Sequence, residues 1–525
     1  MSETTDKSLC QQVWYADDSS AGGRMTEIRK WWDILFEAGP KYGYFPKPSK
    51  TVLILKDPGQ LSRAEELFSH TGIKITTCGE RHLGAVVGSD EFRKEYITNK
   101  VNNWIQDIEQ LSVLAVDEPQ LAYSAYTKAL CMRWCFLQRT IPDTKEYFVP
   151  LEDAIRNKFI PSILGRNVSD LERRYLALPV RLGGIGIQNP TLTAEIEFAN
   201  SSILTRNLTR LIENQERNLD NYDDEAIKAD VLRMKAEKEQ DFIQELQEIK
   251  DLIVDQKLTR CLELASEKGA GAWLTALPLQ NMGYILNKQE FRDGICLRYG
   301  WKIPNTPSFC RCKMKNSHDH TLNCKLGGYV NMRHNNIRDF EAKLLREVCK
   351  DVKVEPILMP VGITGTESTN NAEKARLDVS AVGVWSSMER TFLDVRVMHP
   401  NSPSYEDMSP KDIYDKHEKE KKRSYNNRVM QIEKGTFTPL IFSTTGGMGP
   451  ECARYHKRIA ELLAHKRGEE YSHVVNHVRT RIRFALLKSV LIAIRGERGR
   501  GRKEKEAQME DLSLNLIPER SAYEV

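Results

Sequence analysis

Short apolar runs bounded by Pro, Gly and small turn residues mark the first 90 residues, a pattern typical of β-strands. The string Tyr15-Ala16-Asp17-Asp18 lies between an apolar run and small turn residues. This order predicts a strand–turn–strand hairpin with two carboxylates on its bend. A Pro-containing turn then leads into an apolar strand at 51–55. Two further β-type runs are expected at 73–75 and 82–88, with a Gly-containing turn between them.

The apolar positions change to a helical period from about residue 91. Helices are expected at 96–114 and 122–137, and a short helical module at 273–297. The segment 213–268 is rich in Glu, Lys, Gln and Leu and contains neither Gly nor Pro. It predicts a long charged helix that simply connects its neighbours, or else a coiled coil that acts as a spacer or dimer arm.

Strand and helix periods alternate in the C-terminal third. A helix is expected at 340–348, with Glu341 at the edge of its apolar face. Later elements are expected in the order strand, strand, strand, helix, strand and two helices, at about 352–357, 377–385, 391–397, 411–430, 437–443 and from there to 495.

Composition sets limits on the class of protein. The 525 residues are enough for about three or four domains, and 40% apolar with 29% charged residues is ordinary for globular protein. No apolar run approaches the roughly 20 residues of a membrane span, and the N-terminus has no secretory pattern. Eleven scattered cysteines favour a reducing, intracellular compartment. The basic segment 495–505 predicts nucleic-acid binding or a nuclear localisation signal, which favours the nucleus over the cytoplasm.

Four ligand-type residues lie within fifteen positions: Cys310, Cys312, His320 and Cys324. Zinc prefers four such ligands in a tetrahedron, and this spacing predicts a closed, structural Zn²⁺ site. His318 is an alternative third ligand, and free thiols are the alternative to the site as a whole.

Asp378 and Asp394 are expected on neighbouring strands, each among apolar residues. Buried carboxylates are costly unless they are paired or bind a metal, so this pattern predicts a Mg²⁺ or Mn²⁺ site. Arg396 follows on the same strand face as Asp394. An ordinary ion pair between Asp394 and Arg396 is the alternative interpretation.

The N-terminal motifs resemble the back half of a reverse transcriptase palm. This resemblance is carried by three motifs: Tyr15-Ala16-Asp17-Asp18, Gly43-Tyr44-Phe45 with Lys50, and the Leu83-Gly84 turn. The stretch 178–187 is similar to one found downstream of the polymerase core in retrotransposon proteins, and 91–205 would be the thumb. The family's palm needs an earlier aspartate and a template-contacting segment, and neither fits before Tyr15. Asp17 and Asp18 are therefore expected to be relics of a truncated palm, unable to extend a primer alone.

The C-terminal third resembles the restriction-like endonuclease domain of non-LTR retrotransposons. This resemblance is carried by the zinc motif, by Arg333-His334-Asn335 after it, and then by Asp378 and Asp394. The chain departs from the pattern at two positions. Leu377 stands where that family usually has Pro, and Arg396 stands where the nuclease pattern has Lys. The working lysine can come from the next helix in that family. The residues implied as catalytic are Glu341, Asp378, Asp394, Arg396, Lys421 and Tyr425, and those implied as DNA-binding are Arg333, His334, Arg338, Lys422 and Arg423.

Together these patterns predict a multidomain α/β protein. The expected parts are a palm remnant (1–90), a helical thumb (91–205), a helical spacer (206–268), a helical module with a CCHC zinc knuckle (269–335), a mixed-sheet restriction-endonuclease-like domain (336–500) and a tail (501–525).

The resemblance implies Mg²⁺-dependent nicking of DNA, with DNA and the element's own RNA as partners and no membrane. The spacer could support a homo-oligomer. The alternatives are a catalytically dead nucleic-acid-binding protein and a decayed retroelement reading frame.

Overall fold

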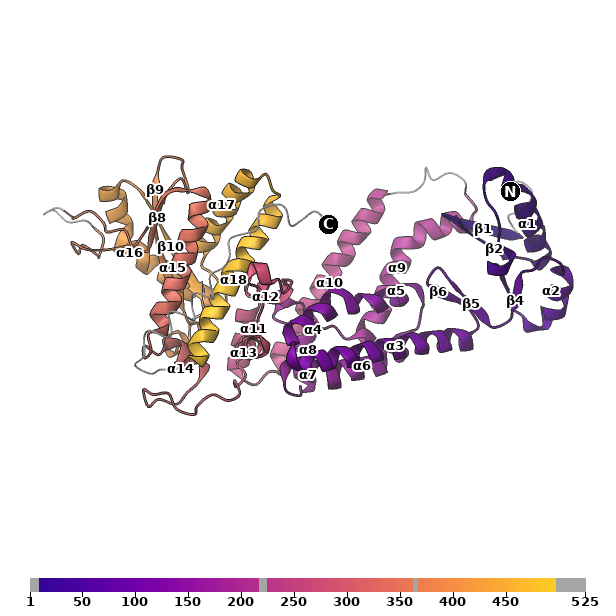
Figure 1. Cartoon of the computed structure of the whole chain (residues 1–525), viewed down its shortest axis with the longest axis horizontal. Helices are drawn as coiled ribbons and strands as arrows, with labels where there is room; N and C mark the ends of the chain where they lie inside the picture. Colours follow the sequence, from indigo (N-terminus) through magenta and orange to yellow (C-terminus); the bar gives the residue numbers. More distant parts are fainter. Residues whose placement is uncertain (1–8, 217–223, 362–366, 497–525) are drawn as a thin grey trace. The chain divides into compact units, whose positions relative to one another are not determined.

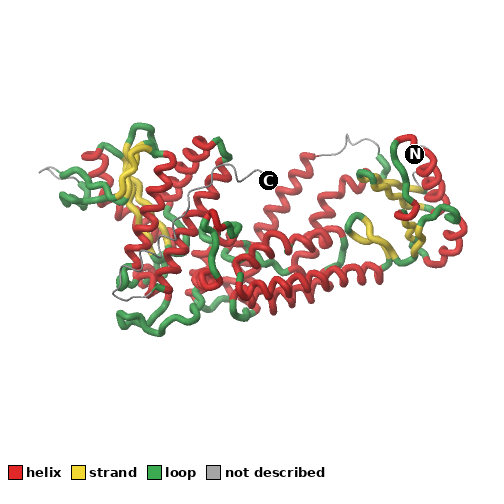
Figure 2. Tube along the Cα trace, viewed as in Figure 1, coloured by secondary structure: helices red, strands yellow, loops and turns green. Residues whose placement is uncertain are grey.

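The computed structural model describes residues 9–216, 224–361 and 367–496. The protein is mixed α/β, 61% helical, with small sheets (Figures 1 and 2). Its contacts divide it into two units, each built from several segments of the chain. The first unit comprises 1–112, 126–159 and 188–241, and the second comprises 113–125, 160–187 and 242–525. The predicted tail, 501–525, lies outside the described residues.

The strands of the first unit form two-stranded ladders. They are β1 (Cys10–Tyr15), β2 (Asp18–Gly23), β3 (Val52–Ile54), β4 (Lys74–Thr76), β5 (Gly79–His82) and β6 (Ala85–Gly88). β1 and β2 pair antiparallel, as do β5 and β6, whereas β3 and β4 pair parallel. The helices α1 (Met25–Ala38) and α2 (Leu61–Leu67) pack their apolar faces against the β1–β2 and β3–β4 ladders. The predicted hairpin around Asp17 and Asp18 is confirmed.

The helical part of the first unit packs around aromatic side chains. It consists of most of α3 (Asp90–Asp117), α5 (Met132–Thr140), α6 (Val149–Ala154), α9 (Pro190–Glu213) and the first half of α10 (Asp224–Leu252). Trp104 lies 6.0 Å from Trp134 and 6.3 Å from Phe148 between ring centres. Both α3 and α5 therefore bury the face that the helical period predicts.

Of two predictions for the middle of the chain, one is confirmed and one is wrong. The segment 122–137 is helical as expected, with a π-helical turn at Tyr126–Leu130. The segment 213–268 is not one long helix: α10 ends at Leu252, and α11 (Gln256–Ala265) begins after a short break. In addition, the expected thumb and spacer are each divided between the two units.

The second unit has a predominantly helical framework. Its helices, besides the ends of α3 and α10, are α4 (Pro119–Ala125), α7 (Ile160–Leu164), α8 (Asp170–Ala177), α11, α12 (Ala272–Thr275), α13 (Lys288–Tyr299), α14 (His318–Asn323), α15 (Tyr329–Val348), α16 (Pro410–Arg428), α17 (Pro450–Arg467) and α18 (Tyr471–Arg495).

A four-stranded mixed sheet lies at the centre of the C-terminal third. Its strands are β7 (Lys350–Val354), β8 (Val379–Val382), β9 (Arg390–Met398) and β10 (Thr436–Ser443), in the order β10-β9-β8-β7. β9 pairs antiparallel with β8 and parallel with β10, and α16 forms the crossover between the two parallel strands (Figure 1). Pro439, which has no N–H to donate, lies in the edge strand β10.

The sheet has helices on both faces, which explains why β9 and β10 are buried along almost their whole length. Leu393, Val395 and Leu440 pack with apolar residues of α15, α17 and α18 on one face. Met398 and Ile441 pack with Ile413 and Tyr414 of α16 on the other. The mixed sheet and its flanking helices confirm the element order predicted for 336–500.

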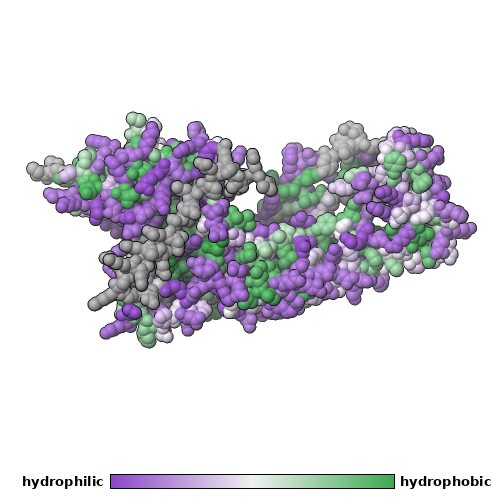
Figure 3. Space-filling view, in the orientation of Figure 1, coloured by the Kyte–Doolittle hydropathy of each residue, from purple (hydrophilic) through white to green (hydrophobic). Residues whose placement is uncertain are grey.

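The surface drawn in Figure 3 carries mostly hydrophilic residues with smaller apolar patches. In the part of the chain that the structure describes, none of the helices has both the length and the apolar character needed to cross a membrane.

Candidate functional site

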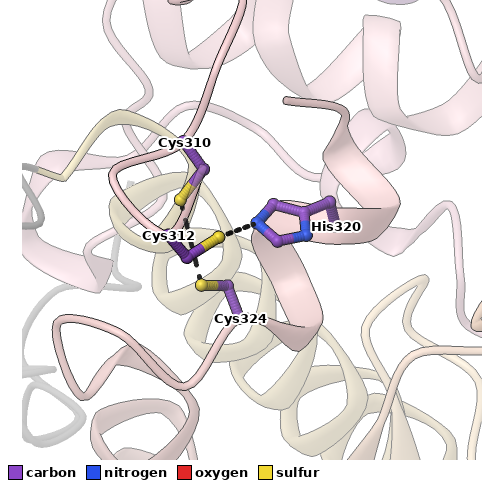
Figure 4. Close-up of side chains that lie close together, drawn as sticks. All are labelled: Cys310, Cys312, His320 and Cys324. Atoms are coloured by element: carbon purple, nitrogen blue, oxygen red, sulfur yellow. Dashed lines mark hydrogen bonds between the residues drawn. The ribbon is translucent and has the colours of Figure 1, made fainter. Parts of the chain in front are cut away.

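The four predicted zinc ligands come together in one cluster (Figure 4). Cys310 and Cys312 lie on a tight loop that is closed by a bridge between Phe309 and Lys315. His320 lies in α14, and Cys324 follows directly after that helix. The hydroxyl of Ser317 caps α14 by accepting a hydrogen bond from the His320 N–H. A short loop and a capped helix therefore present their ligands to the same point.

The spacing of the ligand atoms suits a tetrahedral zinc ion. Cys310 Sγ and Cys324 Sγ are 3.9 Å apart, and Cys312 Sγ and His320 Nε2 are 3.2 Å apart. Zn–S bonds of about 2.3 Å give a tetrahedral edge of about 3.8 Å. His318, the alternative ligand, instead borders a cavity of about 40 Å³ that His399 also lines. The cluster can thus hold zinc through three sulfurs and one imidazole.

The electrostatics of the cluster favour a thiolate at Cys310. Burial opposes its ionisation, but hydrogen bonds from the Cys312 backbone and from the side chains of His320 and the other two thiols lower its pKa to about 6. The pKa of Cys324 is raised, first by burial and then by its neighbour Cys310. Because zinc takes thiolates, one ligand is ready near neutral pH and the others ionise as the ion binds.

Asp378 and Asp394 lie directly opposite each other in the sheet. Val379 pairs with Leu393 in the antiparallel register, and one step beyond them the Asp378 N–H donates to the Leu393 carbonyl at 3.1 Å. The Asp378 Oδ2 also accepts from the Val395 N–H at 2.6 Å. Strand register therefore forces the two carboxylates into contact, as the sequence pattern predicts.

Lys421 of α16 completes this arrangement. Its Nζ lies 2.7 Å from Asp394 Oδ2. On α16, His417 and Lys421 are one turn apart, and Ile413 and Tyr414 pack the preceding turn against β10 and the end of β9. The buried face of the helix thus carries Lys421 to the carboxylate pair.

The two carboxylates have opposite pKa shifts. Asp394 is only 6% exposed, and burial together with the neighbouring Asp378 raises its pKa to about 7, although Lys421 lowers it. Burial is the largest influence on Asp378 and opposes its ionisation, but His334, Asp394 and the Val395 backbone together lower its pKa. Like charges in contact cannot both ionise cheaply, so full ionisation of the pair requires positive charge beside it, part of which Lys421 supplies.

His334 is the group of α15 that reaches this pair. Its Nε2 lies 3.0 Å from Asp378 Oδ1, and its side chain is 33% exposed. His334 and Lys421 line a cleft of about 680 Å³ whose walls also include Arg396, Ser402 and Tyr405. The carboxylate pair is therefore next to an open, polar groove.

Glu341, which the sequence places at the same site, has a different environment. It is fully buried, and its Oε1 lies 2.9 Å from His456 Nε2 of α17. Two helical turns separate it from His334, about 10 Å along the axis. Glu341 therefore belongs to the core between α15 and α17 and not to the carboxylate pair, which corrects the prediction.

Arg396 and Tyr425 also have partners outside the pair. Arg396 Nη1 binds Glu420 Oε2 at 3.0 Å, and Asp394 pairs with Lys421, so the alternative interpretation of an Asp394–Arg396 ion pair is wrong. The Tyr425 hydroxyl accepts from Asn370 at 3.0 Å, and its ring packs beside Phe437. The structure thus brings Lys421, and neither of these two, to the carboxylates.

The predicted DNA-binding residues differ in their availability. Arg333 is only 3% exposed and donates to the carbonyls of Leu322 and Val397, which corrects its assignment to a DNA surface. Arg338 is paired with Asp339 and Glu355. Lys422 binds Glu451 at 3.0 Å, whereas Arg423 is exposed.

The zinc cluster is tied to the groove by contacts that the sequence analysis missed. Arg333 joins the end of α14 to β9, and Asp319 Oδ1 lies 2.9 Å from His399 Nε2 just beyond β9. Asn323 Oδ1 accepts from Ser402 at 3.0 Å. These partners are 64 to 80 residues apart in sequence, and no local pattern signals them.

Asp17 and Asp18 are exposed at the bend of the β1–β2 hairpin. Among the described residues, only the Cys310 cluster brings three or more Cys, His, Asp or Glu ligand atoms within 4.8 Å of one another. The hairpin carboxylates thus do not belong to such a group there.

No family model matches this chain, and no curated protein was found to be similar to it.

Proposed function

We propose that this protein is a metal-dependent DNA-nicking enzyme derived from a non-LTR retrotransposon, with its reaction centre at Asp378, Asp394 and Lys421. The observation that carries the proposal is the 2.7 Å ion pair between Lys421 and Asp394, formed beside an Asp378 that strand register holds opposite. Lys421 and His334, which contact Asp394 and Asp378 respectively, line a cleft of about 680 Å³.

The donor set fits a hard divalent cation. Asp378 and Asp394 would hold Mg²⁺ or Mn²⁺, because carboxylate oxygens in contact need a cation between them when both are ionised. The ion, when bound, supplies Lewis-acid charge and a water of lowered pKa. Lys421, which pairs with Asp394 and lines the cleft, would stabilise negative charge on a phosphate there with its ammonium group.

The chemistry is tested with supercoiled plasmid and Mg²⁺ or Mn²⁺. The wild-type chain is expected to convert it to open circles, and Asp378→Asn/Asp394→Asn is expected to abolish this conversion. Asp407→Asn, which changes an exposed aspartate after β9, is the matched control and should nick like wild type. Undiminished nicking by the double variant would overturn the assignment.

Lys421 gives an independent test of the same centre. Lys421→Met keeps most of the side chain's length but removes its charge, so nicking should fall by about 100-fold, in line with the loss of one preorganised donor. Equal rates for Lys421→Met and wild type would remove Lys421 from the reaction centre.

A nucleic-acid-binding protein without catalysis is the second candidate. It is favoured by Arg396, which stands at the lysine position of the nuclease pattern and is paired with Glu420. This candidate predicts DNA binding that weakens steeply with salt, and an intact plasmid with every metal.

We propose further that the Cys310 cluster binds a structural Zn²⁺ and that Asp17 and Asp18 support no polymerisation in this chain. Three sulfurs and one imidazole at tetrahedral spacing support the first statement. Asp17 and Asp18 lie exposed at the bend of a hairpin, where aspartates commonly serve the turn itself, and this supports the second. Template-directed primer extension that Asp17→Asn/Asp18→Asn abolishes would contradict the second.

A further inference from the structure

A tyrosine, a histidine and a glutamate form a hydrogen-bonded chain at the wall of the cleft. Tyr405 ends the short 3₁₀ turn Pro403–Tyr405 after β9, and its side chain is half-buried. Its hydroxyl lies 2.8 Å from Nε2 of His417, a buried side chain of α16. The other ring nitrogen of His417, Nδ1, lies 3.4 Å from Oε2 of Glu420. Tyr405 lines the cleft together with Lys421.

The glutamate fixes the direction of these hydrogen bonds. Burial opposes the ionisation of Glu420, but Arg396 and His417 outweigh it and lower its pKa. An ionised carboxylate only accepts hydrogen bonds, so the proton of the neutral His417 ring is on Nδ1. Nε2 is then an acceptor, and the Tyr405 hydroxyl donates to it. The phenol has no second proton, so it presents only lone pairs to the cleft.

His417 is a proton acceptor that is neutral near pH 7. Burial lowers its pKa most, and Arg396 of β9 and Lys416 of its own helix lower it further, whereas Glu420 opposes them. A proton that reaches Nε2 produces an imidazolium whose charge Glu420 partly compensates. A group that is uncharged at rest and paired once it is protonated suits a general base.

We propose that Tyr405 and His417 act together as the base of the nicking reaction: Tyr405 takes a proton from the attacking water while its own proton passes to His417. This inference rests on the proposed nuclease function and adds the group that activates the nucleophile. The water oxygen forms a bond to phosphorus, and the bond from phosphorus to the leaving sugar oxygen breaks. The leaving oxygen takes a proton from solvent, and His417 later releases one, so the sum is hydrolysis of one phosphodiester.

The hydrogen-bonded chain is close to the proposed reaction centre and is held in place. His417 precedes Lys421 by one turn of α16, about 5.4 Å along the axis, and Lys421 contacts Asp394. Arg260 of α11 donates to the backbone carbonyl of Tyr405 at 3.1 Å. The phenol is thus fixed both by its backbone and by its hydroxyl.

The relay is tested by single-turnover plasmid nicking at a series of pH values. Tyr405→Phe keeps the ring beside His417 but removes the hydroxyl, so the wild type should be about 100-fold faster near neutral pH. Below the pKa of His417 this rate ratio should fall by about tenfold per pH unit, because imidazolium accepts no proton. The ratio cancels titrations that both chains share, such as that of Asp394. Tyr471→Phe, which removes an exposed hydroxyl of α18, should match the wild type throughout.

Nuclear magnetic resonance of the full chain with nitrogen-labelled histidine gives a readout that needs no activity. The signal of His417, identified by its loss in His417→Gln, should show the proton on Nδ1. Its titration midpoint should lie below about pH 6.5 and coincide with the fall of the rate ratio. Arg396→Gln removes a cation that lowers this pKa, so it should move both midpoints to higher pH.

The outcomes separate the relay from the nuclease function. A rate ratio that is the same at every pH would give Tyr405 a purely structural role and overturn the relay, with the nuclease proposal intact. A proton on Nε2 of His417 would do the same, because the phenol would then offer its own proton to the cleft. If the wild-type chain nicks no plasmid, both proposals fail. Circular dichroism checks the fold of each variant, and the tautomer of the wild type tests the relay even if one misfolds.

Discussion

At the residue scale, the carboxylates of the C-terminal third differ in the groups that neutralise them. Asp394 lies beside Lys421 and Asp378 beside His334, whereas Glu341 lies against His456 in the core. The contact between Asp378 and Asp394 follows from the register of their strands, which the alternation of the sequence indicates. Glu341 and Arg333 could not be placed, because their partners lie 115 and 64 residues away. The apolar face of a helix indicates burial, but it does not indicate which charged side chain turns inward at its edge.

The core position of Glu341 gives the first prediction. Glu341→Ala leaves His456 without its buried partner, so the free energy of unfolding should fall by about 3–5 kcal/mol. Glu461→Ala, which removes a surface partner of Arg458 on α17, should change it by less than about 1 kcal/mol. Urea denaturation measures both variants. A catalytic Glu341 would instead show wild-type stability with lost nicking.

A second buried carboxylate gives a pH dependence of stability. Burial raises the pKa of Glu267 to about 7, against the lowering effects of Tyr414 and Arg483. The folded chain therefore binds this proton more tightly than the unfolded chain. The stabilisation is complete below about pH 4.3 and is lost as the pH rises through 7.

Glu267→Gln cannot titrate and should not show this decline. The free energy of unfolding of the wild type minus that of the variant should therefore decrease by roughly 1–3 kcal/mol between pH 4.5 and pH 7.5. Denaturant titrations at a series of pH values provide the measurement. A constant difference would show that Glu267 is ionised throughout this range in the folded chain.

At the element scale, the strands and helices of 336–500 matched their predicted order because each has a clear period and a turn at its ends. The segment 213–268 was wrongly predicted as one continuous helix because it contains neither Gly nor Pro to end a helix. A signal for the break was available: Asp255 caps α11 by accepting from the Lys257 N–H.

The zinc loop and α14 give a prediction at this scale. The purified chain should contain about one zinc per molecule, and Cys312→Ser should lose most of it, whereas Cys349→Ser, outside the cluster, should not. Because Arg333 and Asp319 join α14 to β9, zinc loss should also weaken Mn²⁺ binding at Asp378. Elemental analysis and calorimetry test the two effects. Full zinc content in Cys312→Ser would contradict the four-ligand site.

At the scale of the whole molecule, the predicted linear series of domains was too simple. Each unit takes separate segments of the chain, so the expected thumb and spacer contribute to both. Composition and periodicity describe a window of sequence, whereas the grouping of windows depends on contacts between distant positions. Of the described chain, the part that contains the candidate site was the one predicted most completely.

The charge distribution predicts how the whole chain responds to salt. Because the net charge of the chain is only +4, its DNA binding should depend on local clusters of cations. The logarithm of the binding constant should fall linearly with the logarithm of the salt concentration. Arg423→Ala should reduce the slope by about one, whereas Lys343→Ala, an exposed cation of α15, should not change it. Fluorescence anisotropy at several salt concentrations measures these slopes. Equal slopes for wild type and Arg423→Ala would exclude Arg423 from the DNA-binding surface.

The register between β8 and β9 also has an evolutionary consequence. The paired ladder covers 379–382 and 390–393, and the connecting turn exposes Met388. Copies of this gene could gain or lose codons at the turn without disturbing the opposed aspartates. One additional codon between Leu393 and Asp394 would move Asp394 to the other face of the sheet. Length variation should therefore be frequent at the exposed residues 386–388 and rare on either side, in lineages that retain the activity.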